Sequence, residues 1–399
     1  MSLFYRREFE LDEKLIYLNS ANQSICPRRV LSRISEYHRE YERNPSRGLN
    51  EAWGMLWAIQ SRLAGFLGAD RSDLFLRTNV TSVLNTFLLG VPLPSRSEIL
   101  VGELEYGAIV NACRLRANRD GLGLRVLKLP VSRLGAKRAT VENIVDTVVS
   151  QLGPDTRLLL LSHVLGGTGM VMPIQEIAAE TRRRDIFLVV DGAYAPGAVP
   201  VDFRNLGDID FYGCSLYKWM LGPKGTAFGW VAKRNQELLE PLSAGWTTFE
   251  SFGPFGDFGE GSRFQQTFLM AGCHDFAPFQ AVGTLLDLWE EWGAANLRSH
   301  LFELGARLSE GIERELGWPR VASAVPELRG PLYAHELPDR LQPEGGGLLD
   351  RAWKELGIQL NTARIRGRWY AVLSPHVYNT EEELERAVEH LGRSSLRGA

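Results

Sequence analysis

The stretch Asp208-Ile-Asp-Phe-Tyr-Gly-Cys-Ser-Leu-Tyr-Lys218-Trp-Met-Leu-Gly-Pro-Lys-Gly225 decides the fold that we expect for this chain. Its pattern predicts a short buried strand that runs into a polar turn presenting Lys218, followed by a Gly-Pro-Lys-Gly loop. A lysine held on a turn in an apolar setting loses its proton readily and can attack a carbonyl group. Lys218 is therefore a candidate nucleophile.

A second stretch upstream, Ile186-Phe-Leu-Val-Val-Asp-Gly-Ala-Tyr-Ala-Pro-Gly197, places an acid after a β-branched run. Ligands of α/β folds bind at the carboxyl ends of the strands, which is where Asp191 falls. A Schiff-base lysine paired with an aspartate is the arrangement that pyridoxal phosphate requires. Each residue alone would also fit an ordinary surface lysine or a helix-capping aspartate.

The bulk composition is that of a soluble globular protein. The chain has 399 residues, of which 44% are hydrophobic and 23% charged, and this length suggests two domains. A net charge of −3 gives no electrostatic reason to expect binding to nucleic acid or a membrane surface. The four cysteines lie far apart without a Cys-x-x-Cys pair, so we expect no metal site, no disulfide framework and a cytoplasmic location.

The chain resembles fold-type I pyridoxal-phosphate enzymes of the class V aminotransferase group, and within it the isopenicillin N epimerase-like branch. The resemblance rests on the ordered pair Asp191-Gly-Ala and Ser215-Leu-Tyr-Lys218, and it runs from Tyr17-Leu-Asn19 to Tyr378-Asn-Thr380. It implies an α/β fold with a mostly parallel, seven-stranded sheet in a large domain and a small α+β C-terminal domain. It also implies pyridoxal phosphate as the cofactor and a homodimer with active sites at the interface.

The order of elements predicts where the domains lie. Strands and helices alternate from about residue 74 to 232, as in a parallel sheet wrapped by helices, and the pattern becomes α+β from Asn296. We predict an N-terminal arm over 1–25 that joins the small domain, a large domain over 26–270 and the small domain over 271–399. Pro27 opens a predicted helix over 28–43, which Asn44-Pro-Ser-Arg47 breaks.

Several residues are candidate cofactor contacts. The polar start of a helix at Thr78-Asn-Val-Thr-Ser82 follows a strand and is suited to bind an anion, although it could equally be a simple N-cap. By resemblance, Val80 and Thr81 hold the cofactor phosphate and Tyr106 stacks on its ring. His163, at the end of the strand over 157–164, would contact the phenolic oxygen of the cofactor and the reacting part of the substrate. Core packing is the alternative for Tyr106 and His163.

Other positions depart from the pattern of the family. Tyr194 and Tyr217 stand where the family has other polar side chains, and a tyrosine can still donate a hydrogen bond to the cofactor. Ser215, of the Ser-x-x-Lys motif, completes the predicted cofactor set. Cys273 replaces a threonine that reaches the phosphate of the partner subunit, which puts that contact in doubt.

The substrate side is less defined. By resemblance, Asn19 faces the substrate and Arg47 points toward the active site. Alternatively, Arg47 is a solvated arginine of a loop. The usual carboxylate-binding arginine is missing from Ala371-Val-Leu-Ser374. Arg364 and Arg366, alternating with Arg368, could be presented inward by one face of a strand, or the strand could be a solvated edge.

These features suggest a reaction, which we state as a hypothesis. Lys218 removes the α-proton of an amino acid, and Asp191 keeps the ring nitrogen protonated so that negative charge passes into the ring. The resemblance favours β-elimination from an S-conjugated cysteine in specialised metabolism. Oxidative deamination with loss of carbon dioxide, epimerisation, transamination or a non-catalytic role are the alternatives. Desulfuration is disfavoured because no cysteine lies on a loop of the C-terminal half beyond Cys273.

Overall fold

The large sheet forms the centre of the computed structural model, which describes residues 2–245, 248, 262–269 and 272–393. Within these residues, seven strands pair in the order β2-β8-β7-β6-β5-β3-β4. All run parallel except β8, which is antiparallel to both of its neighbours. The strands are β2 (Leu74–Arg77), β3 (Glu98–Gly102), β4 (Gly123–Leu127), β5 (Thr156–Ser162), β6 (Phe187–Asp191), β7 (Phe211–Ser215) and β8 (Ala227–Val231).

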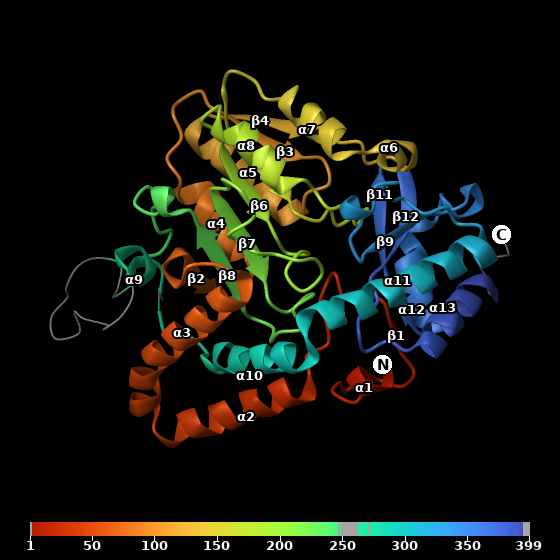
Figure 1. Cartoon of the computed structure of the whole chain (residues 1–399), viewed down its shortest axis with the longest axis horizontal. Coiled ribbons are helices and arrows are strands. Elements are labelled where there is room, and N and C mark those ends of the chain that lie inside the picture. Colours follow the sequence, from red (N-terminus) through yellow and green to blue (C-terminus); the bar gives the residue numbers. More distant parts are fainter. Residues whose placement is uncertain (1, 246–247, 249–261, 270–271, 394–399) are drawn as a thin grey trace.

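The middle strands are buried because helices cover both faces of the sheet (Figure 1). Leu158 to Leu161 in β5 have no exposed surface, as expected of a parallel strand packed on two sides. The connecting helices are α4 (Val80–Gly90), α5 (Gly107–Asp120), α6 (Arg133–Arg138), α7 (Val141–Val149) and α8 (Ile174–Arg182). The predicted mostly parallel α/β fold is therefore confirmed.

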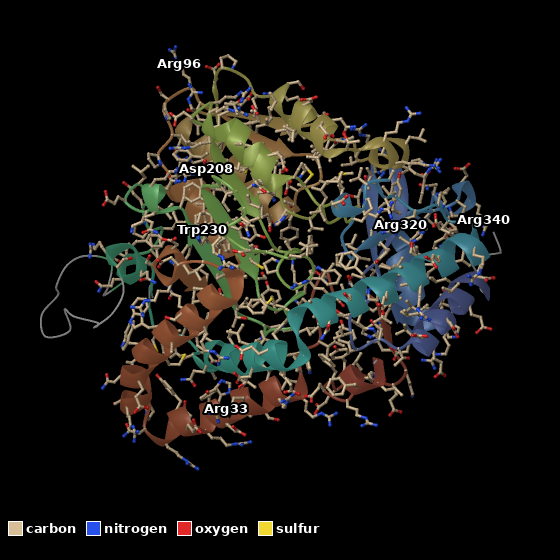
Figure 2. The ribbon with its side chains drawn as sticks, in the orientation of Figure 1. Arg33, Arg96, Asp208, Trp230, Arg320 and Arg340 are labelled. Atoms are coloured by element: carbon tan, nitrogen blue, oxygen red, sulfur yellow. The ribbon has the colours of Figure 1, made fainter. Side chains whose placement is uncertain are left out.

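A smaller antiparallel sheet lies beside the large one in the C-terminal part of the chain (Figure 1). Its order is β11-β12-β9, and helices pack against it. In Figure 2, Trp230 marks β8 of the large sheet and Arg320 marks the C-terminal half. The elements are α11 (Ala294–Leu316), β9 (Tyr333–Glu336), α12 (Leu348–Leu356), β11 (Asn361–Ile365), β12 (Arg368–Leu373) and α13 (Glu381–Arg393).

The N-terminal segment joins this C-terminal part. After α1 (Ser2–Arg6), strand β1 (Ile16–Tyr17) pairs in parallel with β10 (Ile358–Gln359). By contrast, α10 (Ala277–Trp292) packs against α2 (Arg28–Arg43) and α3 (Pro45–Leu67) below the large sheet (Figure 1). The predicted domain boundary at residue 270 would assign α10 to the small domain, and it stays a prediction.

One predicted break is shorter than expected. Helix α2 has the predicted bounds, but α3 begins directly afterwards, so Arg47 lies in a helix and not in a loop. Asn44 ends one helix and caps the next, because its side-chain oxygen accepts the Arg47 N–H at 3.1 Å. Pro45 fits the first turn of a helix, where its missing N–H costs nothing.

The alternating arginines do not lie on one strand, which corrects the sequence prediction. Arg364 lies on β11 and Arg368 begins β12, while Arg366 and Gly367 form the turn between them with φ values of 47° and 87°. Two successive residues with positive φ form the tight turn that suits the twist of a hairpin. The chain therefore reverses where the alternation was expected to continue. The irregular loop predicted over 245–261 lies almost wholly outside the described residues.

Candidate active site

A cavity of about 320 Å³ opens where the large sheet meets the C-terminal hairpin. The carboxyl ends of β5 and β6 supply part of its wall, as the strand-end rule predicts. Strand β11 supplies another part. The residues that line the cavity include Val80, Leu104, Glu105, Tyr106, Ser162, Gly166, Asp191, Ala193, Tyr194, Lys218, Arg364 and Ile365.

Asp191 and Lys218 meet in this cavity. Asp191 ends β6 and is only 4% exposed, and one of its oxygens accepts the Ala193 N–H at 2.9 Å. Burial raises the pKa of Asp191, and the charge of Lys218 partly opposes that shift. The buried carboxylate would therefore be stabilised by a cation placed against it.

In the loop that carries Lys218, three consecutive backbone carbonyls accept hydrogen bonds. The Lys218 carbonyl accepts the Leu221 N–H at 2.9 Å, with Leu221 at a φ of 65°. The Trp219 carbonyl lies 3.2 Å from His376 Nε2, and the Met220 carbonyl accepts Trp289 Nε1–H at 2.9 Å. The first contact is a turn within the loop, and the other two come from distant parts of the chain, so tertiary structure helps to fix the position of the lysine.

Tyr194 packs between Gly166 and Lys218. The Lys218 Nζ lies 4.4 Å from the centre of the Tyr194 ring. A Cβ atom at Gly166 would lie 2.7 Å from Tyr194 Cε2, so a side chain there would displace the ring. Burial raises the pKa of the Tyr194 phenol, which stays protonated and able to donate a hydrogen bond at neutral pH.

The N-terminus of α4 borders the cavity through Val80. The Val80 N–H donates to Ser215 Oγ at 3.1 Å, and the Ser82 N–H donates to the capping Asn79 Oδ1 at 2.8 Å. Thr81, between them, belongs to the same first turn, where N–H groups lack partners within the helix. The helix start is therefore N-capped by Asn79, and its role in binding an anion stays a prediction.

His163 does not line the cavity, although the resemblance to the family predicts a contact with the cofactor. Its ring is buried and its Nδ1 lies 3.0 Å from the hydroxyl of Tyr212. The strand pairing continues through His163, whose N–H donates to the Asp191 carbonyl at 2.8 Å. Since adjacent side chains of a strand point to opposite faces, Ser162 faces the cavity in its place.

Seven other predicted residues also lie outside the lining of the cavity: Asn19, Arg47, Thr81, Ser215, Tyr217, Cys273 and Arg366. Asn19 is buried, and its Oδ1 has no hydrogen-bond partner among the described residues. The Tyr217 carbonyl accepts the Ser24 N–H. Arg47 is exposed and pairs with Glu51 at 2.7 Å, and Cys273 is exposed.

The arginines of the hairpin separate into two roles. Arg364 lines the cavity, and in the described part of the chain no carboxylate pairs with it. Arg366 instead pairs with Glu103 at 2.9 Å and donates to the Leu129 carbonyl at 2.7 Å. Arg366 is therefore occupied in holding the hairpin turn against the large sheet, and the prediction that it binds substrate is not supported by its contacts.

Glu105 and Ser162 also line the cavity and were not predicted from the sequence. Ser162 ends β5, and Glu105 lies three residues beyond the end of β3, so the strand-end rule applied to Asp191 also applies to them. Glu105 accepts hydrogen bonds from both the N–H and the hydroxyl of Ser162. A carboxylate bonded twice to one residue across two strands is a long-range feature that periodicity does not show.

The sequence model of the family described as "Aminotransferase class-V" matches residues 16–328. The chain belongs to this family. It is 31% identical to an isopenicillin N epimerase of Amycolatopsis lactamdurans, over 97% of this chain and 96% of the relative. It is also 26% identical to a probable cysteine desulfurase of Xylella fastidiosa (strain 9a5c), over 94% and 90% of the two chains.

Solved structures share the fold. The cystine C–S lyase C-DES, in complex with its reaction product cysteine persulfide, superposes with a TM-score of 0.84 at 22% identity, over 96% of this chain and 98% of that chain. A cysteine desulfurase from Thermococcus onnurineus NA1 superposes with a TM-score of 0.82 at 19% identity, over 100% and 98%. At these identities the similarity shows the fold alone.

Class V aminotransferases are pyridoxal-phosphate enzymes, and the residues present fit that cofactor. Asp191 offers a buried carboxylate that needs a cation, as a protonated pyridine nitrogen would supply. Lys218 offers an amine in the same cavity, and α4 offers a helix N-terminus for a phosphate. Among the described residues, no helix is both long and apolar enough to cross a membrane.

Proposed function

We propose that this protein is a C–S lyase that acts on an S-conjugated cysteine by β-elimination. The observation that carries the proposal is the composition of the cavity. It brings the Lys218 amine, the buried Asp191 carboxylate and the Arg364 guanidinium together with the apolar side chains of Leu104 and Ile365, and no cysteine is among the lining residues that the structure describes.

Lys218 and Asp191 would carry the proton chemistry. Bound pyridoxal phosphate supplies a carbonyl that condenses with amines and a ring that withdraws electrons from the substrate Cα. The Lys218 amine would accept the α-proton. Three backbone contacts hold its loop, which limits where the amine can lie. Asp191 would hold the proton on the ring nitrogen by its negative charge.

Arg364 is our choice for the substrate carboxylate. An arginine binds a carboxylate through two parallel hydrogen bonds, which fixes orientation as well as position. Arg364 lines the cavity, and its Nε makes a long contact of 3.4 Å with the Gly367 carbonyl. Its guanidinium therefore remains available to a ligand, unlike that of Arg366.

The leaving group distinguishes this proposal from a desulfurase. In β-elimination the Cα–H bond loses its proton to Lys218, the Cβ–S bond breaks, and the electron pair leaves with sulfur, which is then protonated to a thiol. Water completes the reaction to pyruvate and ammonia. No protein thiol is needed to receive sulfur. Cys26, Cys113 and Cys214 are buried, and the exposed Cys273 lies outside the lining of the cavity.

Epimerisation is the second candidate, and sequence similarity favours it. Two isopenicillin N epimerases match at 31% and 30% identity over nearly the whole chain, above the 26% of the probable cysteine desulfurases. Epimerisation would begin with the same proton removal at Cα, and the proton would return on the opposite face. The Cβ–S bond would then stay intact.

The test is a substrate panel that separates these outcomes. The protein, saturated with pyridoxal phosphate, is incubated in deuterated buffer with cysteine S-conjugates, and separately with common amino acids and 2-oxoglutarate. Thiol, pyruvate and ammonia in equal amounts support the lyase. Deuterium at Cα with inverted configuration and no thiol supports the epimerase, and amino transfer to 2-oxoglutarate without attack on the conjugates would refute both.

We further propose a homodimer, as in the family that the chain resembles. Arg47 and Cys273, both predicted to serve the active site, are exposed and lie outside the cavity of their own chain. A partner subunit is where such side chains would act. Light scattering of the purified protein measures this directly, and a fully active monomer would refute it.

A further inference from the structure

Glu105 and Ser162 form a buried hydrogen-bonded pair in the wall of the cavity. The Ser162 N–H donates to Glu105 Oε1 at 2.9 Å, and the Ser162 hydroxyl is in contact with Glu105 Oε2. Both residues line the cavity together with Asp191. The close fit depends on Gly102, where a Cβ atom would lie 2.4 Å from Glu105 Oε1.

The contact between the two side-chain oxygens can hold only one proton at a time. When Glu105 is ionised, its Oε2 can only accept, so the Ser162 O–H must point at the carboxylate. When Glu105 is protonated, its own O–H lies between the two oxygens and donates to Ser162 Oγ. The hydroxyl proton of Ser162 must then rotate away from the carboxyl group, and the cavity is the space that Ser162 lines.

We propose that Glu105 is a positioning residue that sets the direction of the Ser162 hydroxyl, which offers the bound cofactor or substrate a lone pair when Glu105 is ionised and an O–H donor when Glu105 is protonated. The inference depends on the cavity being the cofactor site. It does not depend on which reaction follows.

The groups around Glu105 bring the change in its protonation near neutral pH. Burial raises the pKa of Glu105 to about 7, against the two hydrogen bonds from Ser162, which lower it, while the charge of Asp191 raises it further. The other titratable or charged groups on the elements around it are Glu103 and Tyr106 beside it in sequence, Cys113 on α5, Tyr194 after β6, Lys218 after β7 and Arg364 on β11.

Two variants test the proposal. Glu105→Gln keeps the shape of the side chain, and its amide N–H₂ would donate to Ser162 Oγ at every pH, which fixes the hydroxyl in the direction expected for the protonated acid. Ser162→Ala removes the hydroxyl and leaves Glu105 free to titrate. The first measurement is the absorption spectrum of the bound cofactor between pH 5.5 and 8.5. We expect a component with a midpoint near 7 in the wild type, and we expect both variants to lose it.

The second measurement uses the cofactor-free protein. A carboxyl group whose pKa is raised by folding stabilises the fold below its unfolded pKa, and this contribution is lost as the pH rises through the folded value. The wild type and Ser162→Ala should therefore lose stability toward urea as the pH rises to about 7. Glu105→Gln should show a shallower slope, to which Asp191, whose pKa burial also raises, still contributes. A spectral component that persists unchanged in either variant would overturn the proposal. So would a slope in stability without any spectral component, because Glu105 would then be only structural.

Discussion

The two regions that meet in the cavity are held in different ways. Asp191 ends β6 and Lys218 follows β7, and both strands are buried with a neighbour on each side. In the loop of Lys218, three successive backbone carbonyls accept hydrogen bonds. Arg364 lies on β11, the outer strand of a three-stranded sheet, next to a turn with two positive φ angles. The proton chemistry thus rests on the interior of the large sheet, and recognition rests on an edge hairpin.

This difference suggests how the family can vary its substrates. A change at an edge strand alters few packing contacts, whereas a change at β6 or β7 disturbs strands on both sides. We therefore expect substitutions of Asp191 or Lys218, at the carboxyl ends of β6 and β7, to abolish turnover. Substitutions in the hairpin of β11 and β12 should alter substrate affinity and leave kcat nearly unchanged.

Lys218→Ala should have the largest effect. Removing the amine removes both the covalent link to the cofactor and the base, so we expect turnover to fall by at least about 10²- to 10⁴-fold. Borohydride reduction followed by mass spectrometry should attach the cofactor to Lys218 in the wild type and to no lysine in the variant. The control is Lys233→Ala, at an exposed lysine of the same domain. Retained attachment in Lys218→Ala would contradict the assignment.

Asp191→Asn should have the second-largest effect. We expect turnover to fall about 10²- to 10³-fold, because an amide cannot hold the proton on the ring nitrogen. The fold should survive. Burial raises the pKa of Asp191, so its charged form is disfavoured in the folded protein, and the cofactor-free variant should be at least as stable as the wild type at pH 7. Asp208→Asn, at an exposed acid, is the control. Turnover near the wild-type rate would refute the role of Asp191.

The positions of Asp191 and Lys218 could be predicted from the sequence because they depend on local patterns. A buried parallel strand is an apolar run, and residues at or just beyond its carboxyl end lie at the ligand-binding edge, so Asp191 and Lys218 could both be placed. The side to which His163 points could not be placed, because it depends on where the ladder of β5 stops. Hydrogen bonds continue through His163 and turn its ring toward Tyr212.

The hairpin could not be predicted for a different reason. Arg366 adopts a positive φ, which is uncommon for a residue with a side chain, and no local pattern marked the turn as beginning one residue before Gly367. The pair of Arg366 with Glu103 helps to hold that turn, and the two residues are far apart in sequence. The contact of Glu105 with Ser162 is hidden in the same way, since it appears only when β3 and β5 pair.

Arg364→Gln tests the hairpin side of the comparison. The loss of a charged hydrogen-bonded contact is worth about 1.5–3 kcal/mol, so we expect KM for the substrate to rise about 10- to 100-fold with kcat changed far less. Arg368→Gln is the matched control, because Arg368 belongs to the same hairpin but pairs with Glu336 and Asp339. An equal rise of KM in both variants would show that the hairpin acts only through its shape.

Gly367→Ala should have the smallest effect, and it separates shape from contact. Gly367 has a φ of 87°, and no atom lies within 4 Å of an added Cβ, so the substitution introduces backbone strain without a clash. We expect the free energy of unfolding to fall by about 1–2 kcal/mol. Gly54→Ala is the control, because Gly54 lies inside α3 with equal space around it and no positive φ, and alanine there should raise stability by about 0.5–1 kcal/mol. If the hairpin serves recognition, the strained Gly367→Ala variant should also show a raised KM at an unchanged kcat. A fall in kcat with KM unchanged would mean that the hairpin contributes to the chemistry, and the division between the two regions would not hold.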